Sequence, residues 1–101
     1  SVLPFLVTLR GLENLKTVNQ YIDINNCDRL SDISDLISLS SVGNNTTTPY
    51  YNRFDITNCP RLFDFCALSN MAQNFTGSFT LTGNGFNPTL DQIKKGECKS
   101  Q

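Results

Sequence analysis

Four cysteines and a small set of acidic side chains are the residues of this sequence that could do chemistry. The 101 residues include 4 Cys, 9 Asp and Glu, and no His. Without histidine, a serine or cysteine nucleophile lacks its usual general base, and the commonest metal ligand is missing. No Cys-x-x-Cys pair occurs, so a zinc site is not expected. We therefore predict no enzyme activity, no cofactor and no metal.

Cys66 and Cys98 lie outside the repeated pattern of the sequence, and Cys98 is close to the end of the chain. A pair so placed is best explained as a disulfide that holds the C-terminal segment to the part of the domain before it. Closing a loop of about 30 residues contributes roughly 3 to 4 kcal/mol on the chain-entropy estimate. Such a bond predicts an oxidising compartment.

Cys27 and Cys59 occupy equivalent positions in two neighbouring repeats. Neighbouring strands lie ~4.8 Å apart, which is compatible with a disulfide between the two. Equivalent side chains in stacked repeats point the same way, however, and a free cysteine is a small hydrophobic residue that fits a narrow corner. The sequence favours a ladder of buried free thiols, with a second disulfide as the alternative.

Two pairs of aspartates also lie at equivalent positions of the repeats: Asp23 with Asp55, and Asp32 with Asp64. Paired carboxylates could serve as the acid and base of a glycosidase, or bind calcium through oxygen. The favoured interpretation is a solvated outer face, on which the repeated arginines Arg29 and Arg61 offset the repulsion.

An internal repeat must position all of these residues. Nine positions within residues 24–39 recur 32 places later, within residues 56–71. The alternation over residues 21–25 predicts a short strand with Ile22 and Ile24 inward and Asp23 outward. The apolar residues that follow at steps of three predict a tight turn, 3₁₀ or helical segment.

Equivalent segments recur at offsets of 24, 32 and 25 residues, and the longest offset carries an insertion at 43–51. This pattern predicts a mainly β fold with short helical turns. We expect one domain, a right-handed β-helix or leucine-rich-repeat-like solenoid of about four coils, with approximate bounds 1–19, 20–51, 52–76 and 77–101. The first coil is incomplete and the last is a cap. We therefore expect the C-terminal fragment of a longer protein, which self-associates through its exposed N-terminal coil.

The repeats resemble the receptor L domain group. The segments that carry the resemblance are residues 11–18, the strand with Ile22 and Ile24 leading to Asn26, Cys27 and Leu30, and, near the end, residues 64–68, 87–90 and 96–98. The later segments are similar to the last coils of surface-exposed proteins of the Bacteroidetes type. The resemblance implies a leucine-rich-repeat-like, right-handed β-helical solenoid at a cell surface. It carries no ligand-binding residue over to this sequence.

Composition excludes several classes of partner. The net charge is -1, so the chain has no basic field for nucleic acid and no polybasic segment for an anionic membrane. Its longest apolar run, residues 2–7, is far shorter than the ~20 residues of a membrane-spanning helix. An apolar content of 39% is typical of a globular protein.

The predicted function is a non-enzymatic recognition or adhesion module that is extracellular or at the cell surface, either outer-membrane-anchored or secreted. It would bind a protein or glycan through the strand face or through the insertion loop at 43–51. The candidate ligand residues are Tyr50, Tyr51, Asp23, Arg53, Asp55 and Thr80. The alternatives are a structural spacer in a larger surface protein and a fragment of a carbohydrate-active enzyme.

Overall fold

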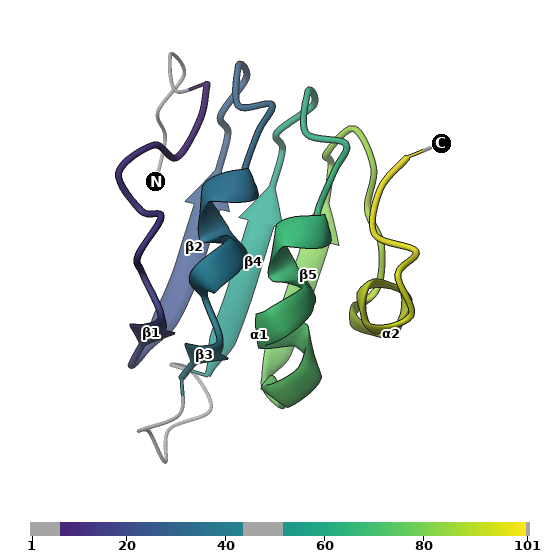
Figure 1. Ribbon diagram of the computed structural model, residues 1–101. Helices are drawn as coiled ribbons and strands as arrows, with labels where there is room; N and C mark the ends of the chain where they lie inside the picture. Colours follow the sequence, from purple (N-terminus) through teal and green to yellow (C-terminus); the bar gives the residue numbers. More distant parts are fainter. Residues whose placement is uncertain (1–6, 44–51, 101) are drawn as a thin grey trace.

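The computed structural model describes residues 7–43 and 52–100, and its strands form two small parallel sheets (Figure 1). The larger sheet has the order β2-β4-β5, with strands Tyr21–Asn25, Arg53–Thr57 and Ser78–Thr82. The smaller sheet pairs β1 (Thr17–Val18) with β3 (Ser41–Val42). The body is compact, with extents of 34 × 28 × 24 Å.

The expected solenoid of about four coils is wrong. In the described residues the strands belong to two separate small sheets, and residues 7–16 contribute one isolated bridge, between Thr8 and Asp32. The C-terminal segment forms a helix and the disulfide. A sequence repeat specifies which residues face the core and which strands pair. It does not specify that pairing continues around closed coils.

Short helical segments lie over one face of the larger sheet, as Figure 1 shows. They are the 3₁₀ helices η1 (Ser34–Ser38) and η3 (Cys66–Leu68) and the α-helix α1 (Ser69–Asn74), with α2 (Leu90–Lys94) beside α1. A Thr-x-x-Gln capping box at Thr89 and Gln92 begins α2. None of the helices within 7–43 and 52–100 has the length and apolar character that crossing a membrane requires.

The core lies between the larger sheet and these helical segments. Parallel pairing places Ile22 beside Phe54 and Phe54 beside Phe79. The rings of Phe54 and Phe79 stack with centroids 5.4 Å apart, and Phe54 is fully buried. The next row of the same face, Ile24, Ile56 and Leu81, repeats this arrangement. Burial of these apolar side chains fixes the register of the three strands, because a shift by one residue would turn them all to solvent.

Each strand of the larger sheet is followed by a residue in the left-handed region. Asn26 and Asn58 have φ values of 56° and 58°, and Gly83 follows β5 with a φ of 69°. Asparagine and glycine adopt this conformation more readily than other residues. Asn84 then stabilises the neighbouring turn, since its Nδ2 donates to the Ile56 carbonyl and its Oδ1 accepts from the Cys59 amide. The side chain of Asn84 therefore links the segment 83–85 to β4 and to the turn that follows it.

The predicted disulfide between Cys66 and Cys98 is confirmed. Its Cα atoms lie 4.9 Å apart. Two backbone hydrogen bonds flank it, from the Phe65 amide to the Cys98 carbonyl at 2.8 Å and from the Ser100 amide to the Phe63 carbonyl at 3.0 Å. The disulfide and these bonds together hold the C-terminal segment against the start of η3.

Candidate functional site

The outer face of the larger sheet carries polar side chains in three rows that run across the sheet, each with one residue from every strand. The rows are Tyr21, Arg53 and Ser78; Asp23, Asp55 and Thr80; and Asn25, Thr57 and Thr82. Alternation along each strand places them opposite the buried apolar rows. We call this surface the strand face.

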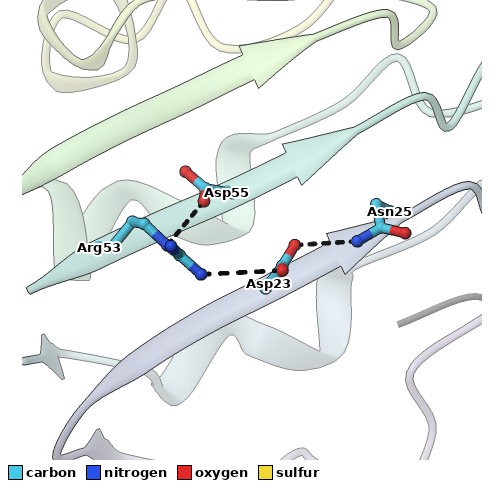
Figure 2. A network of polar contacts seen from close by, with 4 residues as sticks. All are labelled: Asp23, Asn25, Arg53 and Asp55. Carbon is cyan, nitrogen blue, oxygen red and sulfur yellow. Dashed lines mark hydrogen bonds and ion pairs between the residues drawn. The ribbon is translucent and has the colours of Figure 1, made fainter. Parts of the chain in front are cut away.

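Arg53 is the centre of a polar network on the strand face (Figure 2). Its Nε lies 2.8 Å from Oδ2 of Asp55, and its Nη2 lies 3.8 Å from Oδ2 of Asp23. The guanidinium carbon lies 4.7 Å from the centroid of the Tyr21 ring, which is a cation–π contact. Asn25 extends the network, because its Nδ2 donates to Oδ1 of Asp23 at 3.2 Å.

Two carboxylates therefore share one guanidinium, and both are partly shielded from water. The side chains of Asp55 and Arg53 are only 19% and 23% exposed, and that of Asp23 is 34% exposed. Burial raises the pKa of Asp55 above its ordinary value, the charge of Arg53 opposes this rise, and the charge of Asp23 adds to it. A hydrogen bond from the Thr80 side chain favours the ionised form of Asp55 and so also limits its pKa. The network keeps an excess of negative charge.

The second aspartate pair has a different role. Oδ1 of Asp32 accepts from the Ser34 amide at 2.7 Å, and Oδ1 of Asp64 accepts from the Cys66 amide at 2.9 Å. Each carboxylate thus satisfies an amide at the start of a 3₁₀ helix. Hydrogen bonds from the side chain and the backbone of Ser34 lower the pKa of Asp32. Both aspartates border an open hollow that Ile37 also lines.

No group of three or more His, Cys, Asp or Glu within 7–43 and 52–100 is arranged to hold a metal ion. The aspartate pairs instead bind a guanidinium on the strand face and backbone amides at the two 3₁₀ helices. The carboxylate pairs considered for calcium are therefore engaged with protein groups.

The structure brings together three of the predicted ligand residues, Asp23, Arg53 and Asp55, and places Thr80 in the same row as both aspartates. Tyr50 and Tyr51 lie outside the described residues, as does nearly all of the insertion loop. The N-terminal coil expected to self-associate lies partly outside them too, and that association stays a prediction.

Sequence reasoning missed the cation of the network. We expected Arg29 and Arg61 to offset the aspartate charges, but the cation found beside both Asp23 and Asp55 is Arg53. The contact of Arg53 with Tyr21 was missed as well. Both could have been found by extending the 32-residue offset to the start of the strands, because it pairs position 21 with position 53.

Cys27 and Cys59 are both free and fully buried. Their Sγ atoms make equivalent hydrogen bonds, from Cys27 to the Asn25 carbonyl at 3.5 Å and from Cys59 to the Thr57 carbonyl at 3.6 Å. Burial raises the pKa of the Cys59 thiol, which suppresses the reactive thiolate.

Comparison of the chain with family models, with curated proteins and with solved structures found no match. The resemblance to the receptor L domain group therefore gains no support from known proteins. Function has to be argued from the surface of the molecule itself.

Proposed function

We propose that this protein is a non-enzymatic, extracellular recognition module that binds a protein or glycan ligand through the strand face. The observation that carries the proposal is the Arg53 network. Four side chains from two strands restrain one another there before any ligand arrives. Restrained side chains lose less conformational entropy on binding, which favours affinity.

The chemistry of the strand face selects for ligands that donate hydrogen bonds. Asp23 and Asp55 provide carboxylate acceptors, and Thr80 and Thr82 add hydroxyl groups. Sugar hydroxyls, amides and basic side chains can donate to these groups. An anionic ligand is disfavoured, because two carboxylates already share the positive charge of Arg53.

The arrangement of the aspartates supports a binding role over a catalytic one. Asp23 and Asp55 point at the same guanidinium from neighbouring strands. In glycosidases the two carboxyl groups flank the scissile bond of the sugar. An extracellular location is supported by the Cys66–Cys98 disulfide, since such bonds persist in oxidising compartments.

The test is a binding screen of the purified protein against a printed glycan array and a display library of extracellular protein domains. Each ligand found is then measured with Arg53→Ala and Asp55→Asn. The matched control is Gln73→Ala, which changes an exposed residue of α1. We expect binding to fall at least tenfold in both strand-face variants and to stay unchanged in the control.

Two results would contradict the proposal. If ligands bind all three variants equally, the strand face is not the binding surface. If neither screen yields a ligand for a folded protein, the structural-spacer alternative is favoured. Sulfated and sialylated glycans serve as internal controls, because an excess of negative charge on the strand face predicts that they bind worse than neutral ones.

A further inference from the structure

The free thiols of Cys27 and Cys59 lie side by side at the ends of two paired strands. Parallel pairing runs through Asn25 and Thr57, and the Asn26 amide continues it by donating to the Thr57 carbonyl at 3.0 Å. The two chains then turn through residues with nearly equal φ, 56° at Asn26 and 58° at Asn58. The cysteines that follow therefore keep the spacing of neighbouring strands, ~4.8 Å between Cα atoms.

This spacing lies within the range of Cα separations that disulfides span. In the same molecule Cys66 and Cys98 are bonded at a Cα separation of 4.9 Å. The two Sγ atoms are not bonded to each other, and each donates to the carbonyl two residues before it. Rotation about the Cα–Cβ bonds would exchange these weak hydrogen bonds for a bond between the sulfur atoms.

The two buried thiols belong to turns whose neighbouring residues are exposed. Cys27 lies between the exposed residues Asn26 and Asp28, and Cys59 follows the exposed Asn58. Asn84 helps to hold the turn of Cys59, because its side chain accepts from the Cys59 amide at 3.0 Å and donates to the Ile56 carbonyl at 2.9 Å. Local opening of these turns would expose both sulfur atoms without separating the strands.

We propose that Cys27 and Cys59 are a latent second disulfide, which forms when a small-molecule disulfide such as oxidised glutathione reaches them through local opening. One protein thiolate attacks the small disulfide, forms a mixed disulfide and releases the first glutathione thiol. The other protein thiolate then attacks the mixed disulfide at the protein sulfur and releases the second thiol. The cysteine pair loses two electrons and two protons, and the small disulfide is reduced to two thiols.

The buried location makes this reaction slow in the closed protein. Burial raises the pKa of the Cys59 thiol, so that little thiolate is available to attack. Opening of the turn restores contact with water and therefore controls the rate. The same oxidising compartment that preserves the Cys66–Cys98 bond would supply the oxidant.

The test incubates the folded, Cys66–Cys98-bonded protein with oxidised glutathione and maps the products after cleavage following Lys and Arg. We expect a new link between the peptides of residues 17–29 and 54–61, with the loss of two hydrogen atoms from the intact mass. Asn84→Ala should form the link about tenfold faster, because it removes two hydrogen bonds that close the Cys59 turn. Asn70→Ala, which removes a side-chain bond to the Ile37 carbonyl, is the matched control and should leave the rate unchanged.

The single variants Cys27→Ser and Cys59→Ser separate access from geometry, because each retains one of the two thiols, which can take up glutathione but cannot form the Cys27–Cys59 bond. If both variants take up glutathione while the parent protein also stops at mixed disulfides, the geometry is wrong. If the folded parent protein does not react at all, or links Cys27 or Cys59 to Cys66 or Cys98, the proposal is overturned.

Discussion

The two faces of the β2-β4-β5 sheet share the same backbone and differ in what their side chains do. On the inner face Phe54 and Ile56 are fully buried between their neighbours. On the outer face Arg53 and Asp55, one residue away in each case, remain partly exposed and contact charged groups. Packing of the inner face thus determines the strand register. That register in turn determines which side chains of the outer face lie next to one another.

This difference explains how two aspartates come to lie side by side on a stable sheet. Like charges directly opposite one another on neighbouring strands are destabilising. Packing of the inner face outweighs this repulsion, and Arg53 reduces it. The strand face can therefore carry charged and polar groups that the packing of the inner face does not require.

The largest effect should come from the inner face. Phe54→Ala removes a fully buried ring that stacks on Phe79, and we expect it to lower the free energy of unfolding by about 3 to 5 kcal/mol. Urea or guanidinium unfolding followed by circular dichroism measures this change. Phe54→Leu, which refills most of the space, should cost less. A loss below ~1 kcal/mol in Phe54→Ala would show that the inner face does not determine the register.

The turns at the ends of the strands should give the next effect. Asn58→Ala places an alanine at a φ of 58°, and we expect a loss of about 1 to 2 kcal/mol. Asn58→Gly should be close to neutral, because glycine adopts this conformation without strain. The same unfolding assay compares the two variants. Equal losses in both would indicate that the asparagine side chain, and not the backbone conformation, stabilises the turn.

On the strand face, Arg53→Ala should cost at most about 1 kcal/mol, because its ion pairs are partly exposed. Arg53→Lys should retain part of this contribution, since the charge remains. The difference in the free energy of unfolding between the parent protein and Arg53→Ala should become smaller in high salt, which screens exposed charges. A salt-independent loss as large as that of Phe54→Ala would remove the distinction between the two faces.

The smallest effect should come from Asp55→Asn, and its pH dependence is the informative part. The pKa of Asp55 is raised in the folded protein above its ordinary value of 3.8, so the fold prefers the protonated carboxyl. The stability that this preference provides is fully present below pH 3.8 and is lost as the pH rises through the folded pKa. Asparagine resembles the neutral carboxyl and does not titrate.

The variant should therefore gain stability relative to the parent protein as the pH rises from 3 toward neutrality. Unfolding by urea at several pH values measures the difference. The reverse trend, in which the parent protein becomes more stable relative to the variant as the pH rises, would show that the ion pair with Arg53 outweighs the burial of Asp55.

The pairing of neighbouring strands could be predicted from the sequence. Whether the chain continues into closed coils could not. The strand predicted at residues 21–25 is β2, and the equivalents expected around Phe54 and Phe79 lie in β4 and β5. The apolar steps of three residues correspond to the short helices η1 and η3. These features depend on contacts between neighbouring repeats, which the offsets record. The number and closure of coils depend on the ends of the domain, where the pattern is weakest, and there the prediction failed.

The disulfide and the polar site show the same limit. Cys66 and Cys98 could be paired because they break the repeat, and the structure bears this out. The aspartates could be aligned because they follow the repeat. The position of Arg53 at the start of β4 follows from the strand register, and it was missed because the 32-residue offset was not extended back to position 21. The role of Asn84 was missed because its side chain bonds two backbone groups, one in β4 and one in the turn that follows β4.

The three strands pair so that Ile22, Phe54 and Phe79 lie side by side. The packing of the core, the rows of the strand face and the proximity of the two free thiols all depend on this register. Nuclear Overhauser spectroscopy of the labelled protein in solution tests it most directly. We predict contacts between the rings of Phe54 and Phe79, and backbone contacts between Asp23 and Asp55 and between Asp55 and Thr80. Contacts displaced by one residue, with the Phe54 ring exposed and Asp55 directed inward, would contradict the account.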